Sequence, residues 1–344
     1  MISNEPYQKW QGIEVWGDKY AHQYTIQGVC AQGYLYLNNS TVMHAENGVS
    51  LWAEEDRLWN TSGGIVKAVQ SDFIDNTRAV HFVPYENTFP PTGEPCNNLS
   101  SFKLCTFSLD ENFIDHTMFY KHVDLHRVNG IGFYGCNFSL TATSGISPWN
   151  NGIASYGSGF KVDEGCMPPC FSYEPSTFEG FYRALSVLGT EAPYVDYPFE
   201  VRNSDFANNV IGIFASECEW PVIVDNTFVV NHTLVTDGIC DFNFGIGIDM
   251  YRSYGFAIED NIFNNSSQAG NSQYSGIRVD NCPSDHDIIY RNTFNNLSYG
   301  NYAEGTNRQN PNNDQHGVEY RCNQNNNNVV DFIVTDEEII ENAM

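Results

Sequence analysis

The chain has 344 residues, of which 42 are acidic and 16 basic, giving a formal net charge of −26, and this length allows one long domain or two ordinary ones. So few basic residues argue against nucleic acid and anionic membrane surfaces as partners, and acidic polysaccharides would be repelled unless a bound cation intervened. No apolar run approaches the roughly 20 residues of a membrane span, so we expect no membrane insertion.

The opening residues MISNEPYQKW show no basic-then-apolar signal pattern. The chain begins within a structured-looking pattern and ends just after an asparagine-rich stretch. We therefore expect residues 1–344 to form one domain, a fragment of a longer exported protein with flanking domains. The expected location is extracellular or on the bacterial cell surface, with the signal segment outside this chain.

A short triplet ending in an apolar anchor, usually Phe, recurs along the chain. In chain order the anchors are Val42, Phe73, Phe107, Phe138, Phe178, Phe206, Phe228, Phe263 and Phe294. Small or amide residues stand two positions earlier, at Ser40, Ser71, Cys105, Cys136, Ser176, Ser204, Asn226, Asn261 and Asn292. Apolar residues stand five positions earlier, at Leu37, Ala68, Phe102, Phe133, Tyr173, Val201, Ile223, Ile258 and Ile289. Constant local spacing with irregular gaps predicts stacked coils with loops of variable length.

A second short strand follows most anchors, because apolar residues alternate with others there, as in a strand with one buried face. These segments are 48–52, 79–82, 152–156, 212–216, 245–249, 276–280 and 317–321. Each coil would pair in parallel with its neighbours about 4.8 Å away. The anchors would then form an internal Phe column, and the amides of Asn226, Asn261 and Asn292 would hydrogen-bond along it. Long insertions are expected near 84–101, 141–151 and 163–198, where function usually resides.

The ten cysteines do not form a paired CxxC set, which argues against structural zinc. In GCMPPC, Cys166 and Cys170 are the best candidates for a local disulfide. The alternative is that most cysteines are free, buried small residues.

The pattern resembles the right-handed parallel β-helix of the pectate-lyase-like fold. The segments WQGIEVWG and GVEYRCNQ…VVDFIV also resemble parts of large bacterial surface proteins exported by the type IX system. The fold class is therefore expected to be all-β, a single-stranded right-handed parallel β-helix of about nine coils with long loop insertions. Such a fold does not assign a function, because some β-helices are enzymes whereas others bind or act as spacers.

The segment YKHVDLHR (120–127) is the first candidate site in chain order. As a strand it would place His122, Asp124 and His126 on one face, where histidines can bind a metal or act as general acid and base. No third anchored ligand is visible, and an ordinary polar outward face is the competing interpretation.

The C-terminal strands provide the second candidate. With Ile213, Ile246, Ile277 and Val318 aligned inward, one outward column holds Arg278 and Glu319, and the next holds Asp249, Asp280 and Arg321. Asp249 and Asp280 would then lie about 5 Å apart, as in a carboxylate pair for glycoside hydrolysis. Arg278, Glu319, Arg321 and Asp124 could instead bind sugar hydroxyls, and Arg278–Glu319 and Asp280–Arg321 could simply be ion pairs between coils.

The turn PSDHD (283–287) is the third candidate, with Asp285 and Asp287 as possible calcium ligands. It lacks the Gly and the terminal Glu of a known calcium loop, so a solvated acidic turn is the simpler interpretation.

The sequence thus favours a non-catalytic surface or secreted module that acts as a spacer and binds a ligand, with carbohydrate as the leading ligand class. Loop aromatics could stack on sugar rings, and these are Trp16, Trp52, Trp59, Trp149 and Trp220. The alternative is a polysaccharide lyase or glycoside hydrolase that uses Asp249 and Asp280 or the His122–His126 strand. No certain cofactor is indicated, and calcium is the one candidate.

Overall fold

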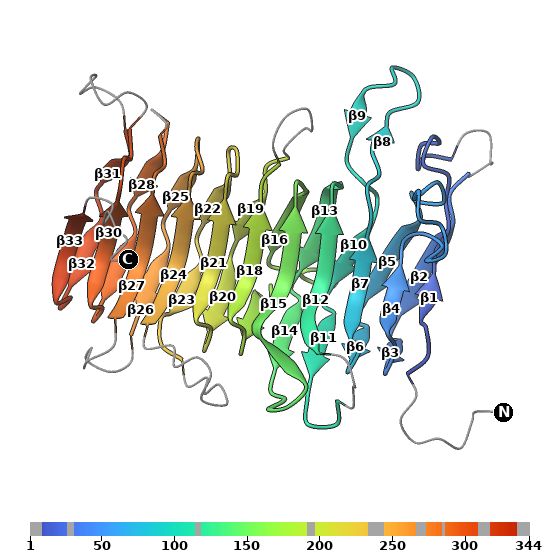
Figure 1. Ribbon diagram of the computed structural model, residues 1–344, viewed down its shortest axis with the longest axis horizontal. Helices are drawn as coiled ribbons and strands as arrows, with labels where there is room; N and C mark the ends of the chain where they lie inside the picture. The colour runs from blue at the N-terminus through green and yellow to red at the C-terminus, as the bar shows by residue number, and fades with distance from the viewer. Residues whose placement is uncertain are drawn as a thin grey trace, which may run out of the picture.

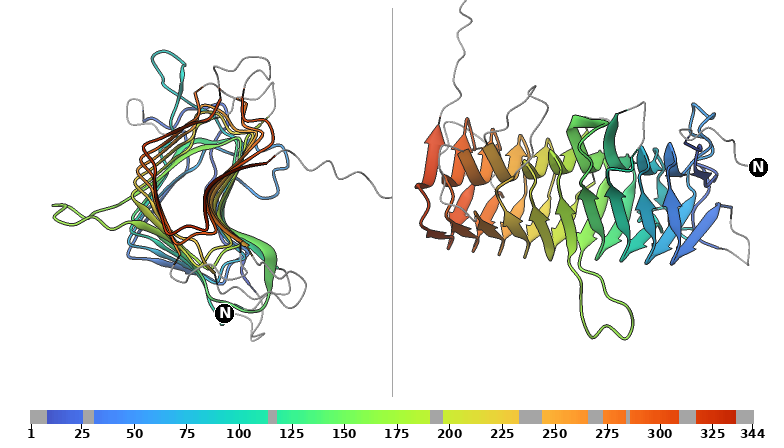
Figure 2. Two further views of the ribbon diagram at one scale, coloured as in Figure 1. Left: turned by 90° about the vertical axis from the view of Figure 1, so that its left-hand side faces the viewer. Right: turned by 90° about the horizontal axis from the view of Figure 1, so that it is seen from below.

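The structure is a computed structural model that describes residues 9–25, 31–113, 118–190, 197–232, 244–265, 273–283, 286–308 and 317–335. In these residues the chain is all-β and winds into a parallel β-helix. Ten successive triplets of strands stack along one axis, with nine steps between them (Figure 1). Seen along this axis, the coils overlie one another around a common interior (Figure 2). The predicted parallel β-helix of about nine coils is confirmed.

Each coil contributes one strand to each of three parallel sheets. Sheet 1 contains, in spatial order, β2 (Tyr34–Asn38), β5 (Ile65–Val69), β10 (Ser101–Lys103), β13 (Asn129–Tyr134), β16 (Gly159–Asp163), β19 (Glu200–Arg202), β22 (Val222–Val224), β25 (Ala257–Glu259), β28 (Ile288–Tyr290) and β31 (Glu319–Arg321). Sheet 2 contains β3 (Thr41–Met43), β6 (Asp72–Ile74), β11 (Thr106–Leu109), β14 (Asn137–Leu140), β17 (Ser176–Glu179), β20 (Ser204–Ala207), β23 (Thr227–Val229), β26 (Ile262–Asn264), β29 (Thr293–Asn295) and β32 (Gln324–Asn326).

Sheet 3 is the longest of the three and carries the candidate sites. It contains β1 (Ile13–Glu14), β4 (Asn47–Ser50), β7 (Arg78–Phe82), β12 (Phe119–His126), β15 (Ile146–Tyr156), β18 (Arg183–Leu188), β21 (Ile211–Ser216), β24 (Phe244–Tyr251), β27 (Gln273–Asp280), β30 (Tyr299–Glu304) and β33 (Val330–Thr335).

The Phe column is confirmed, because the predicted anchors are register partners on sheet 2 from Val42 to Phe294. Adjacent Phe rings in this column stack nearly parallel, with centroids 4.5–5.0 Å apart. Offset stacking of this kind adds to the burial of apolar surface that drives the coils together. The column therefore fixes the register of sheet 2.

The amide column is confirmed as well. Asn261 Nδ2 donates to Asn292 Oδ1 at 3.0 Å, and Asn226 Nδ2 donates to Asn261 Oδ1 at 2.9 Å. The Oδ1 atoms of Asn261 and Asn292 also accept the backbone N–H of the asparagine one coil earlier in the chain, so the buried polar groups at this corner are paired. Earlier coils use Ser hydroxyls in the same way, as when Ser176 Oγ accepts the N–H of Cys136 at 3.1 Å.

Two sequence assignments were wrong. Tyr173 was expected in the buried apolar column of sheet 1 but is exposed. Val162 occupies that position between Phe133 and Val201. The reason is that residues 164–175 form an excursion between β16 and β17. Segment 317–321 does not follow β27 on sheet 3, since β31 pairs with β28 on sheet 1. The strand beside β27 is β30.

The insertions carry local structure of their own. Segment 84–101 contains an antiparallel hairpin of β8 (Asn87–Thr88) and β9 (Pro95–Cys96), which projects from the stack (Figure 1). Segment 141–151 runs into β15, and segment 163–198 is divided, because β17 and β18 within it belong to the coils. The predicted Cys166–Cys170 disulfide is present in the excursion, which extends away from the coils (Figure 2). Among the other described cysteines, Cys96, Cys105, Cys136, Cys282 and Cys322 are free, and three of these are buried.

Candidate binding face

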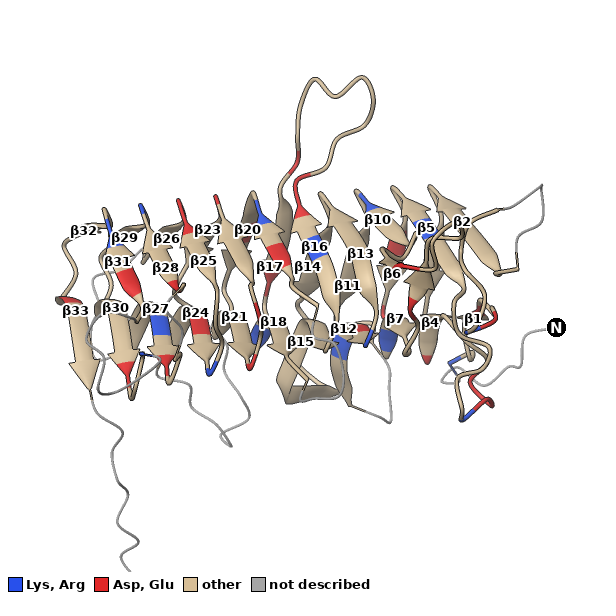
Figure 3. Ribbon diagram, turned by 90° about the horizontal axis from the view of Figure 1, so that it is seen from above, with Lys and Arg blue, Asp and Glu red and all other residues tan. Residues whose placement is uncertain are grey.

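Sheet 3 alternates apolar residues that face the interior with residues on an outer face. At one inward position Ile213, Ile248 and Ile277 are register partners and fully buried. The next position along each strand belongs to the outer face. Charged residues on this face divide into two groups, one on β7 and β12 and the other on β24, β27 and β30 (Figure 3).

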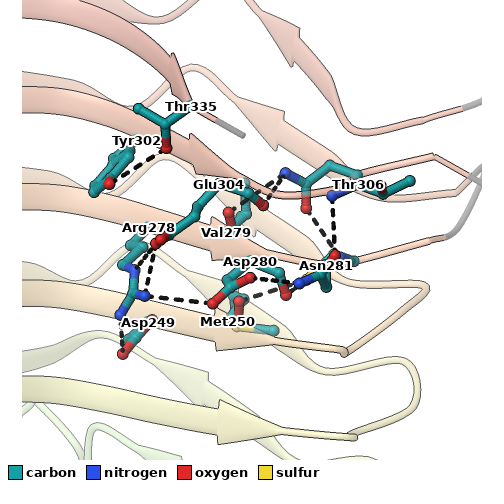
Figure 4. Close-up of polar contacts among 12 residues, drawn as sticks. Asp249, Met250, Arg278, Val279, Asp280, Asn281, Tyr302, Glu304, Thr306 and Thr335 are labelled. Carbon is teal, nitrogen blue, oxygen red and sulfur yellow. Dashed lines mark hydrogen bonds and ion pairs between the residues drawn. The ribbon is translucent and has the colours of Figure 1, made fainter. Parts of the chain in front are cut away.

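The Arg278 cluster, on β24, β27 and β30, places three carboxylates around one guanidinium (Figure 4). Arg278 Nη2 lies 2.7 Å from Glu304 Oε2 and 3.3 Å from Asp280 Oδ2, and Nη1 lies 3.6 Å from Asp249 Oδ2. A single positive charge thus faces three ionisable acids, so this cluster has an excess of negative charge when all three are ionised.

Asp249 is the most deeply placed acid of this cluster, with 5% of its surface exposed. Burial raises the pKa of its carboxyl to about 6, although Arg278 and Arg183 act in the opposite direction. A carboxyl that holds a proton near neutral pH, beside others, can serve as a general acid.

The structure brings Asp249, Asp280 and Arg278 together, but in a register different from the predicted one. Asp249 is the partner of Arg278, and Asp280 is the partner of Tyr251, so Asp249 and Asp280 do not occupy one column. The segment GIGID (245–249) contains two Gly-Ile pairs. The prediction aligned Ile246 with Ile213 and Ile277, but Ile248 of the second pair is their partner. A Cβ on Gly247 would lie 2.5 Å from Phe263 Cδ1, so only glycine fits there.

Glu319 and Arg321 lie away from this cluster. Both belong to β31 on sheet 1, where they pair with each other. The predicted Arg278–Glu319 and Asp280–Arg321 pairs are therefore wrong. Glu304, which the sequence argument missed, is the acid that contacts Arg278 most closely.

The Asp124 cluster, on β7 and β12, has the opposite charge balance. Asp124 Oδ1 lies 3.0 Å from Lys121 Nζ, and its Oδ2 lies 3.6 Å from Arg78 Nε and 3.5 Å from His81 Nε2. The Arg78 guanidinium also contacts His81 Nδ1. One carboxylate thus faces two permanent cations and an imidazole.

The two central groups of this cluster titrate outside their ordinary ranges. Burial works to raise the pKa of Asp124, but its three basic neighbours outweigh burial and lower it. Burial and the adjacent Arg78 charge lower the pKa of His81 to about 3. At neutral pH His81 is therefore an uncharged imidazole, and the cluster has a net positive charge.

The histidines predicted on this strand lie in different environments. His122 is buried, with Nε2 3.2 Å from the carbonyl oxygen of Ser139, and burial lowers its pKa to about 4. The prediction that it shares the outward face of Asp124 and His126 is wrong. His122 precedes Val123 as Ala79 precedes Val80 on β7, and both residues of each pair are buried, so the inward-outward alternation is interrupted at this point of the coil.

An aromatic row runs along the axis beside the Asp124 cluster. Its members are Trp59, His126 and Tyr156, with ring centroids 5.5 Å apart for the first pair and 5.4 Å for the second. Tyr156 is 42% exposed. Three of the other predicted loop tryptophans, Trp16, Trp149 and Trp220, are exposed, whereas Trp52 is buried with its ring edge-on to His81.

Only half of the calcium candidate lies within the described residues. Asp285 is outside them. Asp287 is buried, and its Oδ1 accepts the backbone N–H of Phe256 at 3.3 Å, so the expectation of a solvated turn is wrong for this residue. Across the described ranges no cluster of three or more His, Cys, Asp and Glu side chains is arranged to hold a metal ion.

Comparison with known proteins adds little to this geometry. No family model and no curated protein matches the chain. The chain is similar to the solved structure of the Streptococcus pneumoniae surface protein and adhesin PfbA, with 9% identity and a TM-score of 0.42 over 89% of this chain and 92% of that one. A likeness this low carries no inference about ligand or activity. The described part of the chain has no helix of the length and apolarity needed to cross a membrane.

Proposed function

We propose that this chain is an extracellular or cell-surface binding module and that its ligand is a carbohydrate. The aromatic row of Trp59, His126 and Tyr156 is the observation that carries the proposal. The C–H face of a sugar ring can pack on such rings and release water from apolar surface. The charged groups of Lys121 and Asp124 lie alongside and can hydrogen-bond sugar hydroxyls.

The location is part of the same proposal. A net charge of −26 favours the solubility of an exported protein, and a disulfide such as Cys166–Cys170 persists in oxidising compartments. The type IX export route, suggested by the resemblance of the two end segments, and flanking domains in a longer parent protein belong to this proposal too. The stacked coils would act as a rigid spacer that presents the binding face.

A second candidate function is glycoside hydrolysis at the Arg278 cluster. It is favoured by one observation, that Asp249 has a pKa of about 6 while Asp280 lies against the same guanidinium. In this alternative Asp249 would donate a proton to the leaving oxygen, and Asp280 would act as base or nucleophile.

A glycan array probed with the chain tests the proposal, with exposed tyrosines serving as a matched pair. We expect Tyr156→Ala to lower glycan retention roughly ten-fold, since a stacking anchor contributes about 1–2 kcal/mol. Tyr36→Ala should leave retention unchanged, because Tyr36 is 57% exposed on sheet 1, away from the row. A chain that retains no glycan, or whose retention survives Tyr156→Ala, would contradict the proposed function.

The same array, read with calcium and with a chelator, tests whether a cation takes part. Reducing-end and unsaturated-product assays on every retained glycan separate binding from cleavage. Product formation that Asp249→Asn abolishes would favour the hydrolase. Retention without product supports the binding module.

A further inference from the structure

A column of basic residues that was not predicted from the sequence runs along the outer face of sheet 3. Lys121, Asn151 and Arg183 are register partners on β12, β15 and β18. Arg78 stands two positions before Val80, the partner of Val123, and so continues the column on β7. Three of the 16 basic residues of a strongly acidic chain therefore share one column.

Arg183 differs from the other two in its surroundings. Arg78 and Lys121 both contact Asp124, whereas no described carboxylate lies within ion-pair distance of Arg183, and its charge acts on Asp249 only from farther away. Its Nε is buried and donates no hydrogen bond. Six other described arginines, by contrast, each have a carboxylate partner; they are Arg78, Arg202, Arg252, Arg278, Arg291 and Arg321.

Aromatic rings hold the guanidinium of Arg183 in place. Its Cζ lies 3.8 Å from the ring centroid of Phe214 and 5.3 Å from that of Tyr182. Stacking on a ring face leaves the N–H fork of an arginine free to bind in the plane of the guanidinium. Trp149 packs edge-on against Tyr182 with centroids 4.7 Å apart and is 52% exposed. An exposed aromatic surface, that of Trp149, therefore lies one ring away from the guanidinium.

A planar N–H fork matches the two oxygens of a carboxylate or a sulfate, and the paired bonds are among the strongest that proteins form. Arg183 is only half-buried, so an oxyanion that approaches from solvent can reach its guanidinium and pair with it. The adjacent ring of Trp149 can carry the apolar face of the sugar to which such a group is attached.

We propose that Arg183 is an oxyanion subsite and that the ligand of this face is a glycan bearing carboxylate or sulfate groups. This inference rests on the proposed function and names the class of its ligand. The net charge of the chain disfavours polyanions in general, but within a Debye length of about 8 Å the basic column outweighs distant acids. Binding is therefore expected to weaken as the salt concentration rises.

The test uses immobilised dextran, carboxymethyl dextran and dextran sulfate, together with the neutral and acidic members of the glycan array. We expect wild type to retain acidic glycans at least ten-fold better than neutral glycans of the same backbone. Arg183→Gln should remove this preference and leave neutral retention unchanged. Arg183→Lys should recover only part of it, because an ammonium keeps the charge but loses the fork.

Arg252→Gln is the control variant, because Arg252 also stacks on a tyrosine but has Glu217 as a partner. It should retain all glycans as wild type does. Equal retention of neutral and acidic glycans, or a preference that survives both Arg183 variants, would overturn the oxyanion subsite but not the binding module. Retention of no glycan at all would overturn the proposed function. The relative retention of carboxymethyl dextran and dextran sulfate identifies the preferred oxyanion.

Discussion

The Asp124 cluster and the Arg278 cluster occupy the same outer face of sheet 3 and have opposite charge. In the first, two permanent cations face one carboxylate. In the second, three carboxylates face one guanidinium. The interior beneath them is built alike, because buried apolar side chains lie under both, Val80 and Val123 under the first and Ile248 and Ile277 under the second. One repeated scaffold therefore presents two different electrostatic surfaces.

The difference shows that coil architecture and surface chemistry are specified separately. Interior residues are constrained by contact with the coils above and below, whereas outer residues only have to be compatible with their neighbours on the face. Arg183 lies between the two clusters and has no carboxylate within ion-pair distance, whereas Arg252 and Arg291, which also lie over aromatic rings, each have one. The basic half of the face is thus the half that can accept an anion.

The largest expected effect comes from removing the central cation of the acidic cluster. We predict that Arg278→Gln lowers the free energy of unfolding by about 3 kcal/mol at pH 7.5, because it leaves the buried Asp249 beside two further acids without its nearest cation. Chemical denaturation measures this loss. It should shrink at pH 5, where the carboxylates begin to take up protons.

Asp124→Asn is the matched change in the basic cluster. Its loss should be smaller, about 1 kcal/mol, because Lys121 and Arg78 are 27% and 28% exposed at the side chain and can be solvated. If the two variants lost equal stability, the proposed difference between the clusters would be wrong.

A second prediction concerns pH. The folded pKa of Asp249, about 6, exceeds the ordinary value of 3.8, so the folded chain binds more protons than the unfolded chain between these values. The ionisation of this group therefore lowers stability as pH rises from about 4 to 6, by roughly 2–3 kcal/mol in full. Asp249→Asn removes this dependence. The free energy of unfolding of Asp249→Asn minus that of wild type should therefore increase by about 2 kcal/mol between pH 4 and pH 7.

The buried histidines act in the opposite direction in the same window. Burial lowers the pKa of His81 to about 3 and of His122 to about 4, so wild type loses stability as pH falls below 6.5. For this reason the Asp249 effect has to be read as a difference between variant and wild type at each pH. A difference that does not change between pH 4 and pH 7 would contradict the raised pKa.

The sequence predicts the interior well because repeated contacts leave repeated residue types. The Phe anchors and the asparagines two positions before them identify sheet 2 and its register. The spacing between each anchor and the strand of sheet 3 that follows it is a further signal in the sequence. In Val42–Gly48, Phe73–Ala79, Phe178–Ala184, Phe206–Gly212 and Phe294–Gly300, a small residue stands six positions after the anchor. Applied to the last coil, that spacing selects β30 rather than segment 317–321.

The candidate site was harder to predict, because an outer column can be read only after the register of sheet 3 is known. The double Gly-Ile of GIGID shifted the alignment by two positions and placed Asp249 in the column of Asp280. His122 could not be placed either, because two consecutive positions of its strand, His122 and Val123, are both buried. The environment of Arg183 depends on Phe214, which lies on another coil and carries no motif of its own.

The most direct measurement compares two substitutions on one ligand. The affinity of the best-retained acidic glycan is determined by isothermal titration calorimetry at pH 7 for wild type, Arg183→Gln and Asp249→Asn. We predict shifts of opposite sign: Arg183→Gln binds about ten-fold more weakly, and Asp249→Asn binds two- to three-fold more tightly, because a carboxylate that repels the ligand is gone. Weaker binding by both variants would mean that Asp249 itself holds the glycan, and it would contradict the division of this face into a binding half and a repelling half.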